Sequence, residues 1–184
     1  MVEFPSPFGD DDEPFDAAGT FVPAHIPRPE AFLAGHDVLT GDAHVAFHET
    51  TREVFEERGV YDTTFGYNLA RLNLDGRHED AGFRYAEEAG DPSVLRAEFT
   101  PTTRFCPQAS ALAVGAFRAW NGLSDRHGYR LVRVRVTDLH QRHEEINEQL
   151  RSLEREYRET GSVGRAEENP SERLSARSGA DSPF

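Results

Sequence analysis

The strongest structural constraint in this sequence is a short stretch in which valine alternates with arginine. The segment Arg130–Thr137 contains the run Leu-Val-Arg-Val-Arg-Val. A period of two is typical of a β-strand with two different faces. The valines are predicted to face an apolar core and the two arginines to face water, as in a sheet with one solvated face. The segment therefore predicts a sheet covered by helices on one side.

The segments around this strand show the periodicity of helices and of further strands. Helices are predicted at 42–58, 107–120 and 140–158, and strands at 67–74, 82–87, 94–100 and 130–137. Gly59 follows the first helix at the position where a left-handed residue commonly ends a helix. This order predicts an α/β fold, with a small open mixed sheet of three to four strands packed against two to three helices.

Composition divides the 184 residues into one domain and two tails. Residues 1–35 are rich in proline and acid without apolar periodicity, which predicts a disordered leader. Residues 160–184 are rich in Gly, Ser, Glu and Arg, which predicts a disordered tail. The segment between them, residues 36–159, is long enough to bury a stable core.

The charge balance excludes two classes of partner. Acidic residues number 33 and basic residues 20, so the formal net charge is −13. This argues against nucleic-acid binding and against docking on anionic membranes, both of which need basic patches. All the basic residues are arginine, and with the acidic excess this resembles the proteins of extreme halophiles. No apolar stretch is long enough to span a bilayer and no secretory signal is evident, so we expect a cytoplasmic protein.

The single cysteine, Cys106, is the first candidate for chemistry. It precedes Pro107, which is suited to the first position of a helix. Backbone N–H groups and the helix dipole at such a position favour a thiolate, the form that binds metals and attacks electrophiles. The opposing interpretation is a small, buried and inert residue.

Histidines supply the second set of candidates. His140 and His143 are three residues apart on the last predicted helix, a spacing that brings both imidazoles to one face. His44 and His48 show a similar spacing on the first helix, without the glutamate of a zinc-protease motif. A Cys–His hydrolase with Cys106 as nucleophile and His140 as base stays open. Neither a phosphate-binding glycine loop nor a serine nucleophile elbow occurs.

Two motifs together resemble a known family. The first motif comprises Glu98, Phe99, Pro101, Thr102 and Cys106, and the second His140, Asn147, Gln149, Leu150, Glu154 and Arg155. Their spacing is similar to that of the small iron–sulfur assembly domain found in SufT, in PaaD and in the targeting subunit of the eukaryotic cytosolic iron–sulfur assembly machinery. The resemblance covers residues 69–158.

The resemblance implies a non-catalytic factor that assembles iron–sulfur clusters or delivers them to recipient apoproteins. It implies that Cys106 binds iron or a cluster transiently, that His140 is a second ligand or a hydrogen-bond donor, and that Thr102 shapes the loop holding the cofactor. The residues implied to contact partners are Asn147, Glu154 and Arg155. One cysteine cannot hold a four-cysteine cluster, so the site is shared with a carrier or scaffold protein or within a homodimer.

Two differences from the family pattern keep other functions open. The family's Asp-Pro-Glu motif is absent from residues 59–62, and His143 stands where the family has a glutamate. A metal-free interaction module of the same fold is therefore the first alternative. The second is the thiol-dependent enzyme that would use Cys106 and His140.

Overall fold

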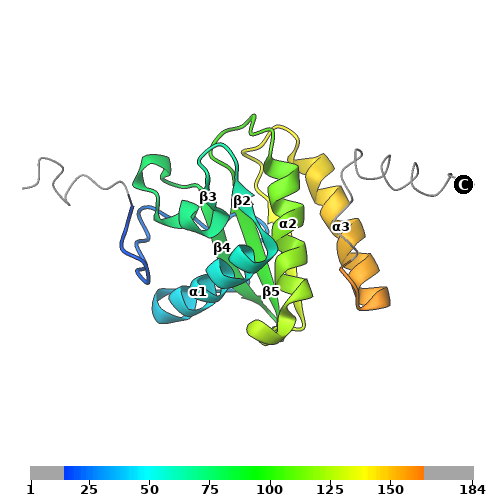
Figure 1. Ribbon diagram of the computed structural model, residues 1–184. Coiled ribbons are helices and arrows are strands. Elements are labelled where there is room, and N and C mark those ends of the chain that lie inside the picture. The colour runs from blue at the N-terminus through cyan, green and yellow to red at the C-terminus, as the bar shows by residue number, and fades with distance from the viewer. Residues whose placement is uncertain (1–14, 164–184) are drawn as a thin grey trace, which may run out of the picture.

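The computed structural model describes residues 15–163, and the remaining residues at both ends lie outside this range. Three α-helices and two sheets make up most of the described chain (Figure 1). The elements are β1 (Asp37–Val38), α1 (Gly41–Arg58), β2 (Tyr61–Asp62), β3 (Tyr67–Asn68), the 3-10 helices η2 (Leu69–Leu74) and η3 (Gly76–His78), β4 (Gly82–Glu88), β5 (Asp91–Thr100), α2 (Ala109–Gly122), the 3-10 helix η4 (Ser124–Arg126), β6 (Leu131–Val136) and α3 (His143–Thr160). The predicted fold class is confirmed.

The main sheet is mixed, with strand order β1-β4-β5-β6. β4 and β5 form an antiparallel hairpin in which Phe83 lies opposite Phe99. β5 and β6 are parallel, and Phe99 also registers with Val136. Because a parallel pair needs a long crossover connection, α2 lies between these two strands in the sequence. Because β5 and β6 run in the same direction, their carboxyl ends lie next to each other at one end of the sheet.

The helices pack on the face of the sheet that carries the alternating apolar side chains. Phe83, Leu95 and Val134 from this face are fully buried in the core, together with Trp120 of α2. α2 runs across the front of the sheet between α1 and α3 (Figure 1). Gly59 adopts a φ of 69° and ends α1 as predicted. The orientation predicted for the valines of β6 is confirmed, since all three are buried.

One predicted strand, at 67–74, is wrong. Only Tyr67 and Asn68 are extended, and the chain then turns into η2. The Asn68 side chain accepts a hydrogen bond from the backbone N–H of Ala70 at 2.9 Å and caps this turn. Leu69 and Leu72, three residues apart, are both buried, so a three-residue turn buries the leucines as well as an alternating strand would.

The expectation of a disordered leader is wrong for residues 15–35, whereas residues 1–14 lie outside the described range. Ile26 and Leu33 are 3% and 0% exposed. Further contacts join this N-terminal segment to the second face of the sheet: the guanidinium of Arg96 lies 4.6 Å from the centre of the Phe32 ring. The second face is therefore covered, and Arg135, expected in water, is only 8% exposed.

Charged side chains fill this covered second face. Arg135 donates to Glu154 of α3 at 2.9 Å, and Glu154 also pairs with Arg133. Glu98 is 2% exposed and accepts a hydrogen bond from the backbone N–H of Glu30 at 2.7 Å. Burial raises the pKa of Glu98 to about 7, although backbone N–H groups of the N-terminal segment oppose the shift.

The free edge of β6 is closed by side chains from the helices. Asn147 of α3 accepts from the N–H of Val136 at 2.7 Å and donates to its carbonyl at 2.9 Å. Asn121 of α2 makes the same pair of bonds with Val132. Each asparagine replaces a neighbouring strand, so the edge does not offer unpaired backbone groups at these positions.

None of the helices in the described part of the chain combines the length and the apolar character needed to cross a bilayer.

Candidate functional site

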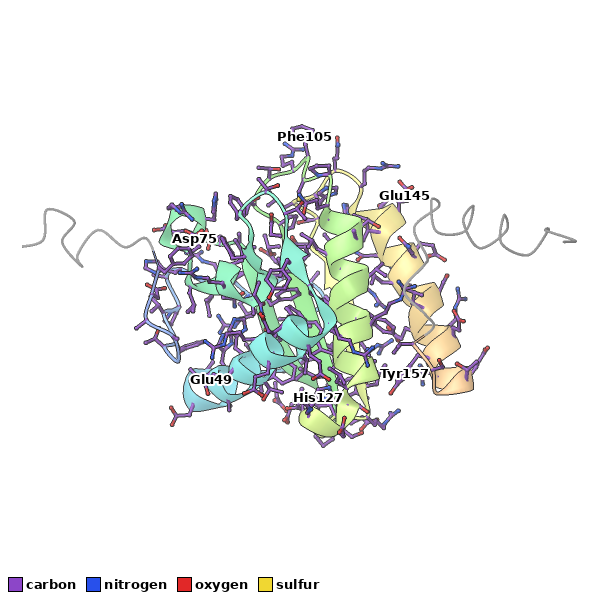
Figure 2. All side chains as sticks on the ribbon, viewed as in Figure 1. Glu49, Asp75, Phe105, His127, Glu145 and Tyr157 are labelled. Atoms are coloured by element: carbon purple, nitrogen blue, oxygen red, sulfur yellow. The ribbon has the colours of Figure 1, made fainter. Side chains whose placement is uncertain are left out.

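The two predicted candidates, Cys106 and His140, lie together at the end of the sheet where β5 and β6 finish. Cys106 belongs to the loop between β5 and α2, and His140 to the loop between β6 and α3. The backbone N–H of Gln141 donates to the carbonyl of Arg104 at 3.0 Å, which joins the two loops directly. Phe105 marks this end of the molecule, close to the start of α3 (Figure 2).

His140 is a positioning residue for the cysteine loop. Its side chain is buried, and its Nε2 lies 2.9 Å from the backbone carbonyl oxygen of Cys106. Its Nδ1 accepts from the backbone N–H of Arg142 at 3.1 Å, so the ring proton sits on Nε2 and is donated to Cys106. With both ring nitrogens occupied, His140 has no lone pair for a metal in this arrangement. Of the two roles expected for His140, metal ligand and hydrogen-bond donor, this arrangement shows the donor, and the acceptor is the backbone carbonyl of Cys106.

The thiol of Cys106 is half-buried, and its position in the helix differs from the prediction. α2 begins at Ala109, with Gln108 as the residue before it, so Cys106 lies outside the first turn. Burial raises the pKa of the Cys106 thiol; hydrogen bonds from the N–H groups of Gln108 and Ala109 act against this, and the negative charge of Asp62 adds to it. The prediction of an acidic thiol is therefore wrong, and the protonated form is the stable one at neutral pH.

Cys106 opens into a cavity of about 320 Å³ between its own loop and the first turns of α3. The residues that line it are Phe105, Cys106, Pro107, Ser110, His140, Gln141, Arg142, Glu145, Ile146 and Gln149. Gln149, one of the residues that carry the family resemblance, accepts from the hydroxyl of Ser110 at 3.0 Å. The cavity thus offers one thiol, with polar groups around it.

Other residues implied by the resemblance lie elsewhere. Thr102 lines a separate cavity of about 510 Å³, beside the buried Thr137. Asn147 and Glu154 are buried and bonded within the chain, so the expectation that they contact a partner is wrong for this arrangement. Arg155 is exposed on α3 and stays available.

Sequence reasoning missed two exposed apolar side chains beside the cysteine. Phe105 is 66% exposed and Leu139 is 40% exposed, and they are the large hydrophobic residues with high exposure in the described chain. They lie on the two loops that Cys106 and His140 join. Large apolar residues inside polar loops are the signal that could have identified them, because no core periodicity accounts for them.

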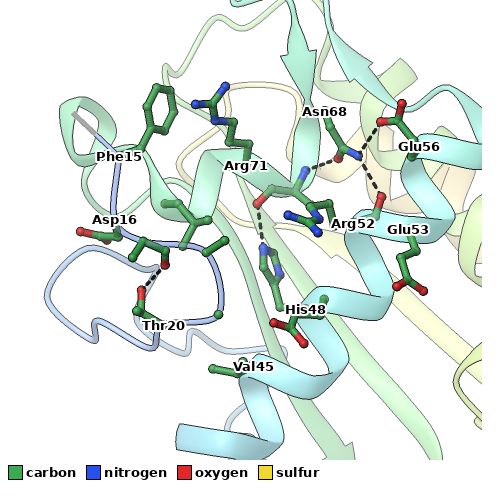
Figure 3. Close-up of a pocket in the computed structure, with 16 residues that line it drawn as sticks. Phe15, Asp16, Thr20, Val45, His48, Arg52, Glu53, Glu56, Asn68 and Arg71 are labelled. Atoms are coloured by element: carbon green, nitrogen blue, oxygen red, sulfur yellow. Dashed lines mark hydrogen bonds between the residues drawn. The ribbon is translucent and has the colours of Figure 1, made fainter. Parts of the chain in front are cut away.

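A separate cavity of about 790 Å³ lies beside α1, against residues 15–20 and η2 (Figure 3). Its wall includes His48, whose Nε2 bonds the carbonyl of Ala70 at 2.7 Å and whose Nδ1 bonds the hydroxyl of Tyr85 at 2.6 Å. Burial lowers the pKa of His48 to about 4 and that of neighbouring His44 to about 3. This pair is neutral and structural.

Between residues 15 and 163, no three side chains of the His, Cys, Asp and Glu types gather in a way that could hold a metal ion. Any metal bound at Cys106 therefore needs further ligands from outside this part of the chain.

Comparison with known proteins gives one match. The model of a family described as a domain of unknown function matches residues 13–164. No curated protein and no solved structure matches the chain.

Proposed function

Because this chain belongs to the DUF7998 family, a domain of unknown function, we propose its function from the site itself: a non-catalytic cytoplasmic factor that helps to assemble iron–sulfur clusters or deliver them to recipient apoproteins. The observation that carries the proposal is a half-exposed thiol, Cys106, held at the mouth of a cavity by His140. Iron or a cluster is cargo in this function and not a resident cofactor.

The donor set supports a transient and shared site. Cys106 is the single cysteine of the chain, and His140 has both ring nitrogens bonded. A cluster held in the usual way needs four protein ligands. The other ligands therefore come from a carrier, from a recipient protein or from a second copy of this chain.

The raised pKa of the Cys106 thiol is suited to a site that both binds iron and releases it. Iron binds the thiolate, so binding at neutral pH displaces a proton and is weaker than at an acidic thiol. A partner that brings positive charge and metal to the cavity favours the thiolate, and its departure restores the thiol. We expect iron binding at Cys106 to tighten as pH rises.

Phe105 and Leu139 supply the contact with the partner in this proposal. Both flank the thiol loop and both are exposed. Aromatic and aliphatic side chains that enter a partner's pocket commonly supply most of the binding energy of an interface. Arg155 on α3 supplies a further polar contact at the periphery.

The test is anaerobic loading of the full chain with Fe²⁺ and sulfide, and with Co²⁺ as a probe of thiolate ligation. We expect sulfur-to-metal charge-transfer absorption in the wild type and in His143→Ala, and its loss in Cys106→Ser. His140→Gln should retain absorption, since His140 positions the loop and does not bind the metal. The loading is repeated with a cysteine-bearing carrier protein present, because this chain supplies a single cysteine. Equal spectra for the wild type and Cys106→Ser, both with and without the carrier, would contradict the proposal.

The alternative is an interaction module that binds no metal. Two observations favour it: the protonated thiol and the occupied ring of His140. In that case Phe105→Ala lowers capture of partners whereas Cys106→Ser leaves it unchanged. The enzyme alternative is disfavoured, because His140 donates to the carbonyl of Cys106 and a raised thiol pKa opposes nucleophilic attack.

A further inference from the structure

A groove of about 520 Å³ lies along the outer surface of α2, between the end of α1 and α3. The lining residues are Arg58, Pro107, Ser110, Ala111, Val114, Gly115, Arg118, Ala119, Gln149 and Val163. Figure 1 shows α2 lying between α1 and α3, with its outer side free of other described elements. The groove shares Pro107, Ser110 and Gln149 with the Cys106 cavity, so the two hollows are adjacent, and the Ser110–Gln149 hydrogen bond lies between them.

The charge of this groove is opposite to that of the whole protein. Arg58 and Arg118 line it, and no aspartate or glutamate is among its described lining residues. Eight other described arginines pair with carboxylates: Arg77, Arg96, Arg126, Arg130, Arg133, Arg135, Arg142 and Arg151. Other arginines, such as Arg28 and Arg104, also form no ion pair within the described residues. What distinguishes Arg58 and Arg118 is that both line one groove, which is locally positive in a chain with net charge −13.

Arg118 shows the deficit most directly. Its Nε is buried and has no hydrogen-bond acceptor within the described chain. Arg58 reaches only the carbonyl of Gly122, at a long 3.4 Å. A buried donor left without an acceptor costs about 1–3 kcal/mol and more when it is charged. The Arg118 side chain also lines the groove, so a carboxylate from outside the described chain that lies there would compensate the charge of its guanidinium.

The floor of the groove suits a polypeptide backbone. Ala111 and Gly115 lie four residues apart on one side of α2 and line the groove, whereas Ala119, one turn farther along, is buried in the core. Small side chains let another chain approach closely. Eight residues separate Ser110 from Arg118, which is about 12 Å along the helix and corresponds to roughly four residues of extended chain.

We propose that this groove binds an extended acidic segment of a partner protein. Small apolar residues of the segment lie on the floor formed by Ala111 and Gly115, and one carboxylate lies against Arg58 and Arg118. Bidentate pairing between guanidinium and carboxylate supplies both affinity and register. The inference does not depend on iron or on Cys106, although a segment seated here lies next to the thiol cavity.

The test uses a fluorescein-labelled, end-blocked peptide, Ala-Val-Asp-Ala-Glu-Ala, and its amide counterpart, Ala-Val-Asn-Ala-Gln-Ala. Binding is followed by fluorescence anisotropy on the full chain. We expect the acidic peptide to bind and the amide peptide to bind about tenfold more weakly or not at all. Arg118→Gln and Arg58→Gln should each weaken binding about tenfold, as expected for a lost hydrogen bond to a charged group.

The matched control is Arg151→Gln, which removes one positive charge at an exposed pair with Glu148 outside the groove. We expect it to leave peptide affinity within about twofold, since exposed ion pairs contribute little. Ala111→Trp fills the floor at an exposed helix position and should abolish binding while circular dichroism stays unchanged. Repeating the titration on Cys106→Ser separates this inference from the proposed function, because peptide binding should persist there.

Three results would overturn the inference. The first is no binding of the acidic peptide at about millimolar concentration; the second is equal binding of both peptides; the third is an equal loss in Arg151→Gln and Arg118→Gln. If sedimentation instead shows a dimer that Arg118→Gln dissociates, the groove is an interface between copies of this chain and the partner segment is excluded.

Discussion

The Nε2 atom of His140 lies 2.9 Å from the backbone carbonyl oxygen of Cys106, across 34 residues of sequence. This bond joins the loop after β5 to the loop after β6 and holds the thiol at the edge of its cavity. The histidine contacts the cysteine through the backbone carbonyl, and both of its ring nitrogens are hydrogen-bonded within the chain.

The first prediction concerns this bond. His140→Ala should lower the free energy of unfolding by about 0.5–1.5 kcal/mol, because the carbonyl of Cys106 loses the hydrogen bond from His140 and keeps only the longer one from the N–H of Ala109, at 3.3 Å. It should also speed alkylation of Cys106, since the loop is no longer held. His143→Ala is the control, as its ring bonds the carbonyl of His140 from a less buried position. Identical denaturation and labelling for both variants would contradict the positioning role.

The second prediction concerns the protonation of Cys106. Its alkylation by iodoacetamide at neutral pH should be slower than that of a free cysteine peptide, and its rate should rise with pH to a midpoint above the peptide's. Asp62→Asn should shift the midpoint to lower pH, because the Asp62 carboxylate contributes to the raised pKa. The amide oxygen of the variant can still accept from the N–H of Thr64. A midpoint below that of the peptide would contradict the raised pKa of Cys106.

The third prediction concerns Glu98 and pH. The pKa of the Glu98 carboxyl is about 7 in the folded chain, whereas the ordinary pKa of a glutamate is 4.5. Because the pKa of Glu98 is higher in the folded than in the unfolded chain, the folded state favours the protonated carboxyl. The contribution of Glu98 to stability is therefore complete below pH 4.5 and is lost as pH rises through 7. The full loss is roughly 3 kcal/mol. Glu98→Gln should therefore gain stability relative to the wild type between pH 5 and pH 8 in urea denaturation, whereas a constant difference between the two proteins would count against it.

The fourth prediction concerns Asn147 at the edge of β6. Asn147→Ala leaves the buried N–H and carbonyl of Val136 without partners, and each costs about 1–3 kcal/mol. Glu148→Ala, one residue along on the exposed side of α3, should change the free energy of unfolding by less than about 0.5 kcal/mol. Chemical denaturation distinguishes the two. Similar changes in the free energy of unfolding for the two variants would mean that water takes over the hydrogen bonds that Asn147 makes with Val136.

Several features followed from local sequence pattern. The valines of β6 recur at every second residue, and the apolar residues of α3 recur at helical spacing. Gly59 offers the left-handed conformation that ends α1. The pattern at 67–74 was misleading because Leu72 and Leu74 alternate as in a strand, whereas the two buried leucines, Leu69 and Leu72, are three residues apart as in a 3-10 helix. The cap from Asn68 favours that turn.

The sequence by itself indicated the three α-helices, the strands β4, β5 and β6 and the core face of β6, because these depend on periodicity. The resemblance implied that Cys106 and His140 share a site, and the parallel pairing of β5 and β6 brings them together. Tertiary structure alone decided that Ile26 and Leu33 of the N-terminal segment are buried, that the pKa of Cys106 is raised and which atoms His140 bonds. Desolvation and hydrogen bonding depend on neighbours distant in sequence. The motifs therefore indicated where Cys106 and His140 lie, whereas the groups packed around them set the protonation of the thiol and the hydrogen bonds of the imidazole.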